Sequence, residues 1–487
     1  MVNGSNGLNT RIIKVLFLAA EADPLVKVGG LGDVAGALPR ALTQIPTELI
    51  DGCGIDIRMV LPFHSIIRKK IPNPTHLVDL TVNSKSGPIQ AQVFQIELNG
   101  LVTYLIAGKP IPEDSPVYSP DPSIDGLKYL FFSLAAIELA KKLNWQPDIL
   151  HANDWHTALT VYALHNEERS GIFFQNTRSV LTVHNLTFMG NSSETAFDEF
   201  GLLASQNPAL PWWAHKSPLP LGLQTSDRIV AVSPTYASEI LTPEYGCGLE
   251  NLLKEREKSI CGIINGLDQE NWNPSTDKSI HKNYSMTTLQ DRSENKKALV
   301  HEFSLNSDPS IPLLILISRM DLQKGVDLAV DALRQAVNRT WQAILLGTGD
   351  PNLENACLSL EKDFPNRIRA AIRFDAPLAR RMYAGADVLL MPSRYEPCGL
   401  AQMIAMRYGC VPLARSTGGL QDTIIDGGTG FLFNAPQSDA FIEALERVLF
   451  QFTNPASWQA IQKQGMAQDF SWHRSAFEYA KMYQNLL

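Results

Sequence analysis

The sequence lacks the features that define several classes of protein. Its six cysteines among 487 residues form no CxxC pair and no metal-ligand spacing, which argues against a zinc site or disulfide framework and favours a reducing, cytoplasmic compartment. No stretch approaches the ~20 apolar residues of a membrane span. The polar segment Met1–Thr10 precedes an apolar run of strand length without a small-residue cleavage pattern, so no signal peptide is expected.

An excess of basic charge is also missing. The net charge is −8 at pH 7, which argues against nucleic acid or an anionic membrane as the main partner, because binding to phosphates normally needs a basic surface. The chain has no DxD acid pair, no GxSxG and no cysteine beside a histidine motif. We therefore expect no metal and no cofactor, and a partner that is neutral or small. The charge of any phosphates on a bound donor is expected to be neutralised by Arg and Lys.

What the sequence does contain is a repeated alternation of apolar runs and helical patterns. At 487 residues with 45% hydrophobic content, the chain is too long for one ordinary core. Near-continuous apolar runs are typical of parallel strands buried on both faces. The polar stretch 271–293 is the best candidate for a linker. We predict an α/β fold of two Rossmann-like domains whose parallel sheets face a central cleft, at 1–275 and 276–455, with a helical tail at 456–487 that bridges back to the first domain.

The expected elements follow from these patterns. In the first half we expect strands at 12–20, 56–61, 147–151, 179–185, 227–233 and 259–264, a hairpin of 89–96 with 102–106 at the edge of the sheet, and helices at 35–42, 130–143, 234–241 and from 157. Residues 190–224 have no clear period and are expected to form a surface insertion. In the second half we expect strands at 313–318, 342–346, 369–374, 387–391 and 410–414, with helices at 294–303, 324–337, 352–362, 377–385, 401–408, 437–452 and 457–486.

A glycine-rich loop follows the first strand. Lys27, Gly29, Gly30 and Gly32 lie between this strand and a helical pattern. Glycines let the backbone approach a ligand, and the N–H groups at a helix start favour an anion such as a diphosphate, to which Lys27 adds charge. The spacing is neither GxGxxG nor that of a P-loop, so neither a dinucleotide nor a Walker-type site is predicted. A purely structural turn remains the alternative.

Two further strands of the first half end in polar residues. Asp154 follows one strand and His184 ends the next. The carboxyl ends of parallel strands meet at one edge of a sheet, where open α/β sheets bind ligands. A single histidine at such a place is often a core or capping residue. The prediction of a site therefore rests on the convergence of Lys27, Asp154 and His184 on one edge.

The second half repeats this arrangement with basic groups. Arg319 offers a planar fork of donors and Lys324 a mobile ammonium across the turn after one strand, which suits a diphosphate. Glu396 lies on the turn after another strand, and glycine turns at 347–349 and 418–419 follow two more. Ordinary surface cations and a Pro/Gly turn with a solvated glutamate are the alternatives.

Taken in order, the motifs resemble a known family over essentially the whole chain. The chain resembles the bacterial glycogen synthases and plant starch synthases. The matching segments are Lys27-Val-Gly-Gly-Leu-Gly-Asp33, His151-Ala-Asn-Asp-Trp-His156, Val183-His-Asn-Leu186, Ser233-Pro-Thr-Tyr-Ala237, Pro243-Glu-Tyr-Gly-Cys-Gly-Leu249, Asn265-Gly-Leu-Asp268, Trp272-Asn-Pro274, Ser318-Arg319, Gln323-Lys-Gly325, Gly347-Thr-Gly-Asp350, Pro392-Ser-Arg-Tyr-Glu-Pro-Cys-Gly-Leu400 and Gly418-Gly-Leu-Gln-Asp-Thr423.

The resemblance implies a retaining glucosyltransferase of the GT-B type. Such an enzyme moves glucose from ADP-glucose to the 4-hydroxyl at the non-reducing end of an α-1,4-glucan. Carried over by motif, Lys27, Arg319 and Lys324 are expected to bind the diphosphate, and the Gly30 backbone to bind the donor. The groups expected around the glucose are His184, Asn265, Glu396 and the Cys398-Gly399-Leu400 backbone. Asp154 is expected on the acceptor side, Phe374 at the adenine face and Thr423 among the substrate-binding residues.

Three departures from the family pattern lie in the first half. Val28 stands where the family usually has threonine, Pro220 stands where a lysine is expected, and Asp125-Gly-Leu-Lys-Tyr129 replaces a pattern like Asp-Asn-x-Glu-Arg-Phe. The motifs of the donor side match fully. Two alternatives therefore stay open: a transferase of the same fold with a small oligosaccharide or other acceptor, and a weakly active glucan-binding relative.

Overall fold

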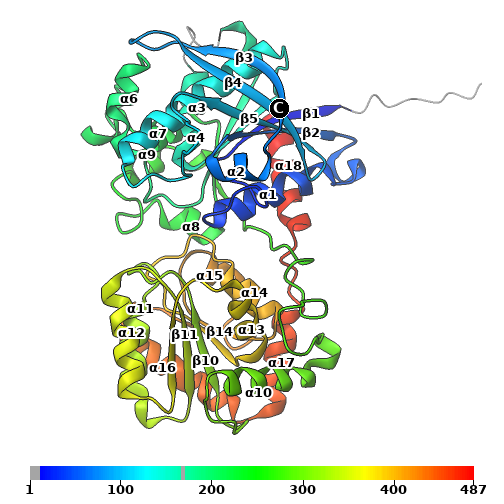
Figure 1. The fold of residues 1–487 in the computed structure, drawn as a ribbon, viewed down its shortest axis with the longest axis vertical. Coiled ribbons are helices and arrows are strands. Elements are labelled where there is room, and N and C mark those ends of the chain that lie inside the picture. The colour runs from blue at the N-terminus through cyan, green and yellow to red at the C-terminus, as the bar shows by residue number, and fades with distance from the viewer. Residues whose placement is uncertain (1–10, 166–170) are drawn as a thin grey trace, which may run out of the picture. The chain divides into compact units, whose positions relative to one another are not determined.

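The computed structural model describes residues 11–165 and 171–487, so Met1–Thr10 lies outside the described residues. The chain divides into two compact units: Met1–Gly266 with Trp472–Leu487 forms unit 1, and Leu267–Ser471 forms unit 2. In Figure 1 unit 1 runs from blue to green and takes in the red α18 (Trp472–Leu486), while unit 2 runs from green to orange-red. The sequence-based borders at 275 and 455 thus fall within unit 2.

Unit 1 is built on a nine-stranded sheet in the order β3-β4-β5-β2-β1-β6-β7-β8-β9. Its central strand β1 (Ile12–Leu18) pairs in parallel on both sides, with Val15 opposite Ile57 and Ile149. Val15 and Phe17 are fully buried, as a strand covered on both faces requires. The other strands are β2 (Gly54–Pro62), β3 (Thr75–Val82), β4 (Ile89–Leu98), β5 (Leu101–Gly108), β6 (Ile149–Asn153), β7 (Arg178–Val183), β8 (Arg228–Ala231) and β9 (Ile260–Gly262).

The predicted hairpin is present as the antiparallel pair β4–β5, but it does not form the edge of the sheet. Strand β3 pairs antiparallel with β4 and occupies that edge. The strand went unrecognised because polar His76 and Asp79 interrupt its apolar pattern and only Leu80 and Val82 are buried. An edge strand with one exposed face and charged residues gives a weak sequence signal.

The helices of unit 1 are α1 (Gly30–Thr43), α2 (Ser65–Lys70), α3 (Pro122–Lys142), α4 (Asp154–Leu164), α6 (Glu194–Glu199), α7 (Pro218–Thr225), α8 (Pro234–Glu239), α9 (Glu250–Glu255) and α18. The expectation that 190–224 is a surface insertion is wrong for its last part, which forms α7. Helix α7 packs against α4, and Leu219, Leu221 and Leu223 are fully buried. A Cβ on Gly222 would lie 2.8 Å from the Ala158 side chain, so the glycine permits this close packing.

Two prolines hid helix α7 from sequence reasoning. Pro218 occupies the first helical turn and Pro220 follows two residues later. The N–H groups of a first turn have no intrahelical acceptor, so proline costs little there. The Pro220 ring is buried, and this departure from the family pattern therefore lies inside a packed helix.

Unit 2 contains a six-stranded, wholly parallel sheet in the order β12-β11-β10-β13-β14-β15. Its strands are β10 (Leu313–Ile317), β11 (Gln342–Gly347), β12 (Ile368–Ile372), β13 (Val388–Met391), β14 (Val411–Arg415) and β15 (Phe431–Phe433). The first five agree with prediction. The last, β15, has three residues, too few for a periodic signal.

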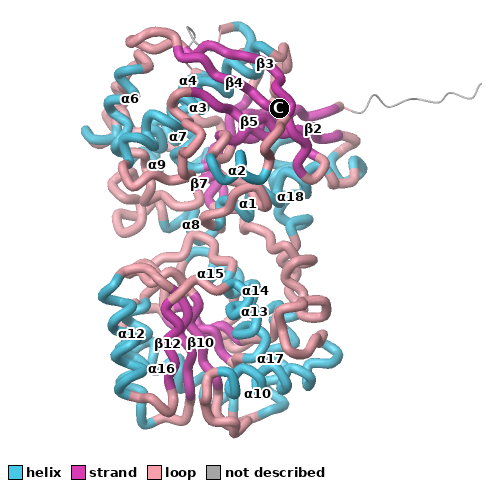
Figure 2. The backbone as a smooth tube through the Cα atoms, viewed as in Figure 1, coloured by secondary structure: helices cyan, strands magenta, loops and turns pink. Residues whose placement is uncertain are grey.

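Helices cover both sides of this sheet, as the magenta strands between cyan helices show (Figure 2). They are α10 (Arg292–Glu302), α11 (Val326–Gln335), α12 (Pro351–Asp363), α13 (Ala376–Gly385), α14 (Ala401–Arg407), α15 (Gly418–Thr423), α16 (Ser438–Phe452) and α17 (Pro455–Met466). The expected helix 457–486 is two helices, α17 and α18, one in each unit. In the described parts of the chain, no helix is long and apolar enough to cross a membrane.

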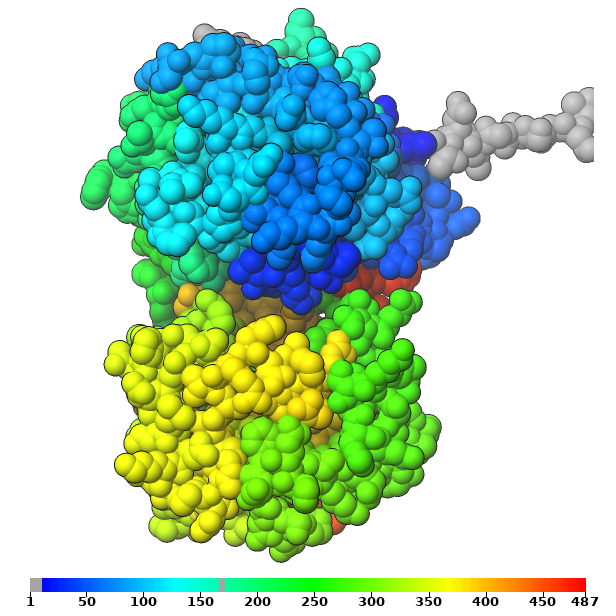
Figure 3. All heavy atoms as spheres, viewed as in Figure 1, coloured from blue at the N-terminus to red at the C-terminus, as the bar shows by residue number. Residues whose placement is uncertain are grey.

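The polar stretch 271–293 lies on the surface of unit 2 and is not a free linker (green, Figure 3). Asp277 accepts hydrogen bonds from Arg380 at 2.9 Å and from the Tyr408 hydroxyl at 2.6 Å. The Tyr284 hydroxyl donates to the Tyr408 carbonyl at 2.7 Å. A few buried anchors thus fix a segment whose composition resembles that of a loop.

Candidate active site

In unit 1 the glycine loop joins β1 to α1. The Lys27 ammonium is half-exposed and lies 2.6 Å from Asp33 Oδ1 in the first turn of α1. Gly30 begins that helix, and a Cβ added to it would meet no atom within 4 Å. The Lys27 ammonium and the start of a helix therefore lie together on this loop, and binding of an anion there stays a prediction.

A buried carboxylate that the sequence analysis did not single out holds this loop. Glu21 is 1% exposed and accepts hydrogen bonds from the N–H groups of Val28 and Gly29 and from the Tyr118 hydroxyl, the last at 3.0 Å. Burial raises the pKa of Glu21, against the effect of these donors. An acid placed directly after a buried strand and before a glycine loop was the signal available in the sequence.

Asp154 begins α4 at the carboxyl end of β6. It is 7% exposed and has a φ of 53°, in the left-handed region that non-glycine residues rarely adopt. Its Oδ1 accepts the N–H of His184 at 2.7 Å and that of Asn185 at 3.4 Å. Burial raises the pKa of Asp154 to about 7 even though these two donors favour the carboxylate.

His184 follows β7 and is joined through Asn153 on the neighbouring β6 to β1, the strand beyond it. Its Nε2 lies 3.0 Å from Asn153 Oδ1, while Asn153 Nδ2 donates to the Leu18 carbonyl at 2.9 Å. Burial lowers the pKa of His184 to about 3, so the imidazole is neutral near pH 7. A neutral ring that donates from Nε2 keeps Nδ1 as an acceptor. The structure thus brings Asp154 and His184 together.

Asn265, which follows β9, carries an unsatisfied polar atom. The residue is 6% exposed, and its Oδ1 has no hydrogen-bond partner among the described residues. Leaving a buried acceptor unpaired costs ~1–3 kcal/mol. This makes Asn265 a good candidate to bind a ligand hydroxyl.

In unit 2 the basic and acidic candidates form an ion pair. Lys324 Nζ lies 2.7 and 2.9 Å from the two carboxylate oxygens of Glu396, and the Ser393 hydroxyl donates to Glu396 at 3.0 Å. The Glu396 side chain is 7% exposed and that of Lys324 22%. The carboxylate therefore has a fixed orientation on the turn after β13, and the ammonium remains open to solvent on one side.

Arg319 lies on the same loop as Lys324, at the carboxyl end of β10. Its side chain is 66% exposed and lies 3.2 Å from Asp321, whose other oxygen accepts the Lys324 N–H at 2.9 Å. Gly325 has a φ of +66°, and a Cβ there would lie 2.0 Å from the Pro392 carbonyl oxygen. Glycine is required at 325 because the loop of Lys324 packs directly on the loop of Glu396.

The third loop of unit 2, after β14, packs on the same turn. The Gly419 N–H donates to the Glu396 carbonyl at 3.0 Å, and a Cβ on Gly418 would lie 2.0 Å from that oxygen. Sequence reasoning assigned a glycine turn here, whereas the structure starts α15 at Gly418. Three strand ends thus build one compact ligand edge.

Cys398, Gly399 and Leu400 form the rest of the Glu396 turn, with Gly399 at a φ of +74°. The Gln402 amide, another residue that sequence reasoning missed, donates to the Cys398 carbonyl at 3.1 Å and to the Gly399 carbonyl at 3.0 Å. It also donates to the Thr423 hydroxyl, which itself donates to the Gly419 carbonyl at 2.6 Å. Thr423 is 4% exposed and in this structure braces the loops.

Phe374 follows β12 on the same edge of the unit 2 sheet, and it is 88% exposed. An exposed ring is available for stacking on a flat ligand group. Within the described ranges, no group of three or more His, Cys, Asp or Glu side chains is arranged to hold a metal ion. Each unit therefore presents its own set of predicted residues at the carboxyl ends of its strands.

Two parallel-sheet α/β domains with ligand groups at their strand ends define a class of proteins, the glycosyltransferases of the GT-B fold. Residues 14–255 match the starch synthase catalytic domain family, and residues 300–461 match glycosyl transferases group 1. The fold is shared with the sucrose-phosphate synthase of Thermosynechococcus elongatus, at a TM-score of 0.60 and 19% identity over 97% of this chain and 99% of that one.

More similar relatives narrow the class. The glycogen synthases of Clostridium perfringens and Geotalea daltonii are 38% and 37% identical, each alignment covering 98% of this chain and 99% of the relative. The catalytic domain of starch synthase IV from Arabidopsis thaliana, solved bound to ADP and acarbose, is 28% identical with a TM-score of 0.83, covering 98% of this chain and 99% of that one. The chain belongs to the glycogen and starch synthase family of glucosyltransferases.

Proposed function

We propose that this glucosyltransferase takes glucose from ADP-glucose and adds it, with retention of configuration, to the 4-hydroxyl at the non-reducing end of an α-1,4-glucan. The observation that carries the proposal is the Lys324–Glu396 ion pair beside the exposed Arg319. The two cations suit a diphosphate, and a carboxylate of fixed orientation suits the hydroxyls of the attached sugar.

The chemistry needs positive charge where the leaving group departs. Cleavage of the bond between sugar and phosphate develops oxocarbenium character on glucose and negative charge on ADP. Fixed cations at the diphosphate stabilise the transition state more than the ground state, because the charge grows there during the reaction. We assign Arg319, Lys324 and Lys27 to this role, and we propose that the Gly30 backbone N–H donates a further hydrogen bond to the ADP-glucose.

Retention follows if the departing phosphate itself takes the proton of the acceptor hydroxyl on the face that it leaves. The two candidate carboxylates are already engaged, Glu396 by Lys324 and Ser393 and Asp154 by two backbone N–H groups. This supports positioning and electrostatic roles for both rather than nucleophilic attack. His184, Asn265 and the Cys398-Gly399-Leu400 backbone then bind glucose hydroxyls, and Asp154 lies on the acceptor side.

Adenine as the nucleotide base is supported by the Arabidopsis relative, which was solved with ADP. In this chain the exposed Phe374 is the candidate to stack on the base. The buried Thr423 belongs to the same set of proposed donor-side residues, through the loop that it braces.

A donor-by-acceptor assay tests the proposal. ADP-glucose and UDP-glucose are each offered with glycogen and with maltooligosaccharides, and nucleotide release and chain extension are measured. We expect ADP-glucose to be preferred and the glucans to be extended. Equal or better use of UDP-glucose would overturn the donor assignment, and transfer to small acceptors but not to glucans would overturn the acceptor assignment.

The configuration of the new bond is tested separately. The product is digested with exo-acting enzymes specific for α-1,4 linkages, and its anomeric protons are followed by NMR. We expect only α-linked glucose. A β-linked product would contradict the retaining mechanism while leaving the donor assignment intact.

A further inference from the structure

A pocket lies in unit 2, at the opposite end of the strands from Lys324 and Glu396. Its volume is about 1000 Å³. Two of the residues that line it, Pro312 and Asp387, directly precede β10 and β13, so the pocket is at the amino ends of these strands. Arg319, Lys324 and Glu396 follow the carboxyl ends of the same two strands. The pocket is therefore separate from the proposed donor site.

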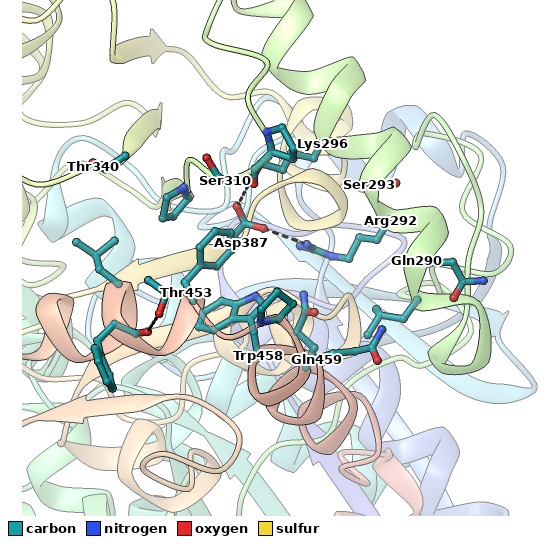
Figure 4. A pocket seen from close by; sticks show the side chains of 18 of the residues that line it. Gln290, Arg292, Ser293, Lys296, Ser310, Thr340, Asp387, Thr453, Trp458 and Gln459 are labelled. Carbon is teal, nitrogen blue, oxygen red and sulfur yellow. Dashed lines mark hydrogen bonds and ion pairs between the residues drawn. The ribbon is translucent and has the colours of Figure 1, made fainter.

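The charged residues of this pocket are three cations, Arg292, Lys296 and Arg339, and two carboxylates, Asp387 and Glu446. Asp387 lies 2.7 Å from the Lys296 ammonium and 3.9 Å from the Arg292 guanidinium, and both side chains reach toward it (Figure 4). At the rim Arg339 pairs with Glu446. Each of these five groups thus takes part in an ion pair with another of them, and the lining keeps an excess of one positive charge. This favours a neutral ligand.

Aromatic rings and one unsatisfied donor also line the pocket. Phe450 is 78% exposed, and Phe452 packs edge-on against Trp458 with ring centroids 5.2 Å apart. Trp458 is 5% exposed, and its Nε1 has no hydrogen-bond partner among the described residues. Buried indole N–H groups usually find an acceptor. A ligand oxygen in the pocket would supply one.

The lining also includes uncharged polar side chains. Gln290, Ser293 and Thr340 are exposed and Gln459 is half-buried around the pocket (Figure 4). Amides and hydroxyls bind sugar hydroxyls, whereas the apolar faces of sugar rings pack on aromatic side chains. We propose that this pocket is a second carbohydrate site, which binds a segment of the α-1,4-glucan away from the reacting chain end. The ligand class rests on the proposed function.

Such a site would act by tethering. A long glucan held at the pocket keeps its other chain ends at a raised effective concentration near the same protein molecule, which lowers the KM for polymer without any effect on the chemical step. A trisaccharide is too short to benefit. Changes in the pocket should therefore alter the KM for glycogen but not the KM for maltotriose. The kcat with each acceptor should be the same in every variant.

The test measures binding and turnover in three variants of the full chain. Phe450→Ala removes the exposed ring, and Trp458→Phe keeps an aromatic ring but removes the N–H. Leu358→Ala on α12, where the side chain is 45% exposed, is the control for loss of an exposed apolar group elsewhere in unit 2. Binding of maltoheptaose is followed by calorimetry without any donor, and circular dichroism confirms that each variant is folded.

We expect binding of maltoheptaose at a site separate from the donor site to weaken by about tenfold in Phe450→Ala, given the apolar area lost. In Trp458→Phe it should weaken by about 3- to 10-fold, the value of one hydrogen bond. The KM for glycogen should rise in both variants, with the KM for maltotriose and kcat unchanged.

Wild-type binding in both folded variants would overturn the proposal, as would an equal loss in Leu358→Ala. Binding at the pocket without glucose transfer would instead overturn the proposed function and leave the carbohydrate site standing. Transfer of glucose to glucan, without any binding that depends on Phe450, would overturn the carbohydrate site and leave the proposed function standing.

Discussion

The two units hold their candidate groups in opposite ways. In unit 1 Asp154 and His184 are withdrawn from solvent and bound by backbone N–H groups and amides, and burial moves the pKa of each toward the neutral form. In unit 2 the candidate groups are charged side chains: Arg319 is 66% exposed, and Lys324, 22% exposed, is paired to the buried Glu396. Apart from the half-exposed Lys27, unit 1 thus presents buried polar groups, whereas unit 2 presents charged side chains.

This difference fits the two demands of the proposed reaction. A diphosphate leaving group needs positive charge, which the guanidinium and ammonium groups of unit 2 supply. Hydroxyl groups of glucose and of the acceptor need oriented neutral donors and acceptors, which burial and backbone hydrogen bonds supply. The four histidines whose pKa is depressed by burial all lie in unit 1, and they make that unit sensitive to acid.

The largest expected effect is therefore a loss of stability of unit 1 in mild acid. Burial lowers the pKa of His64, His151 and His184 from 6.5 to about 3, and that of His156 well below its usual value. A histidine with a depressed folded-state pKa loses its contribution as pH falls below 6.5, because only the unfolded chain takes up the proton. Each costs ~1.4 kcal/mol per pH unit in that range.

Two groups of unit 1 act in the other direction. Burial raises the pKa of Glu21 and Asp154, so they favour the folded state as pH falls toward their ordinary values near 4. Because four histidines act against two carboxyls, we expect a net loss of stability of unit 1 as pH falls from 6.5 to 4.5. In unit 2 hydrogen bonds and ion pairs outweigh burial and lower the pKa of Asp277 and Asp327, whose contributions are lost only below pH 4.

Hydrogen exchange checks the prediction that unit 1 loses stability at a higher pH than unit 2. It is measured on peptides from each unit between pH 7.5 and 4.5 and corrected for intrinsic rates. Protection of β1, β6 and β7 should fall first, while β10 and β13 stay protected. Loss of protection in β10 and β13 at the same pH or earlier would contradict the comparison between the units.

The second effect is catalytic and lies in unit 2. Arg319→Ala and Lys324→Ala should each lower kcat/KM by roughly 10²–10³, as expected for loss of a preorganised donor to developing charge. Arg319→Ala should leave the thermal midpoint unchanged, because the side chain is exposed. Arg334→Ala, which breaks an exposed pair with Asp363 at 2.6 Å, is the matched control and should retain full activity. A loss of tenfold or less in both site variants would remove the diphosphate role.

A smaller effect concerns the pH dependence contributed by unit 1. Since the pKa of Asp154 is raised to about 7, kcat/KM should rise with pH through about 7 as the carboxylate forms and strengthens its bonds to the N–H groups of His184 and Asn185. Asp154→Asn should lower the plateau by roughly tenfold and abolish this acidic limb. Measurements must stay above the pH at which unit 1 unfolds. An unchanged limb in the Asn variant would assign it to another group.

Most of the fold could be predicted because unit 2 is regular. Its long buried strands alternate with amphipathic helices, so five of its six strands were recognised, and β15 was missed because it is short. In unit 1 the polar edge strand β3 and the proline-containing helix α7 went unrecognised, since tertiary packing decides both. Leu219 and Leu221 are buried against α4, which no local pattern reveals.

The site was predicted unevenly for a similar reason. Motifs identify the residues proposed to meet ligands, but they do not show what holds those residues in place. Glu21 and Gln402 lie among such motif residues, and their function depends on hydrogen bonds to backbone groups that approach only after folding. Likewise, the trio of Arg319, Lys324 and Glu396 was expected from two motifs, whereas the ion pair between Lys324 and Glu396 required the structure.

The smallest expected effect concerns Val28, the departure from the family pattern that lies on the glycine loop and faces solvent. Val28 is 60% exposed, and its N–H is held by Glu21, so a side chain at this position can change without disturbing the loop. Val28→Thr adds a hydroxyl beside the proposed diphosphate, and one neutral hydrogen bond should lower the KM for ADP-glucose by about 2- to 5-fold with kcat unchanged. Val28→Ala, which removes bulk and adds no donor, is the control and should leave KM as in the wild type. If Thr and Ala had the same effect, loop packing rather than hydrogen bonding would be responsible, and the glycine loop would lose its proposed contact with the diphosphate at this residue.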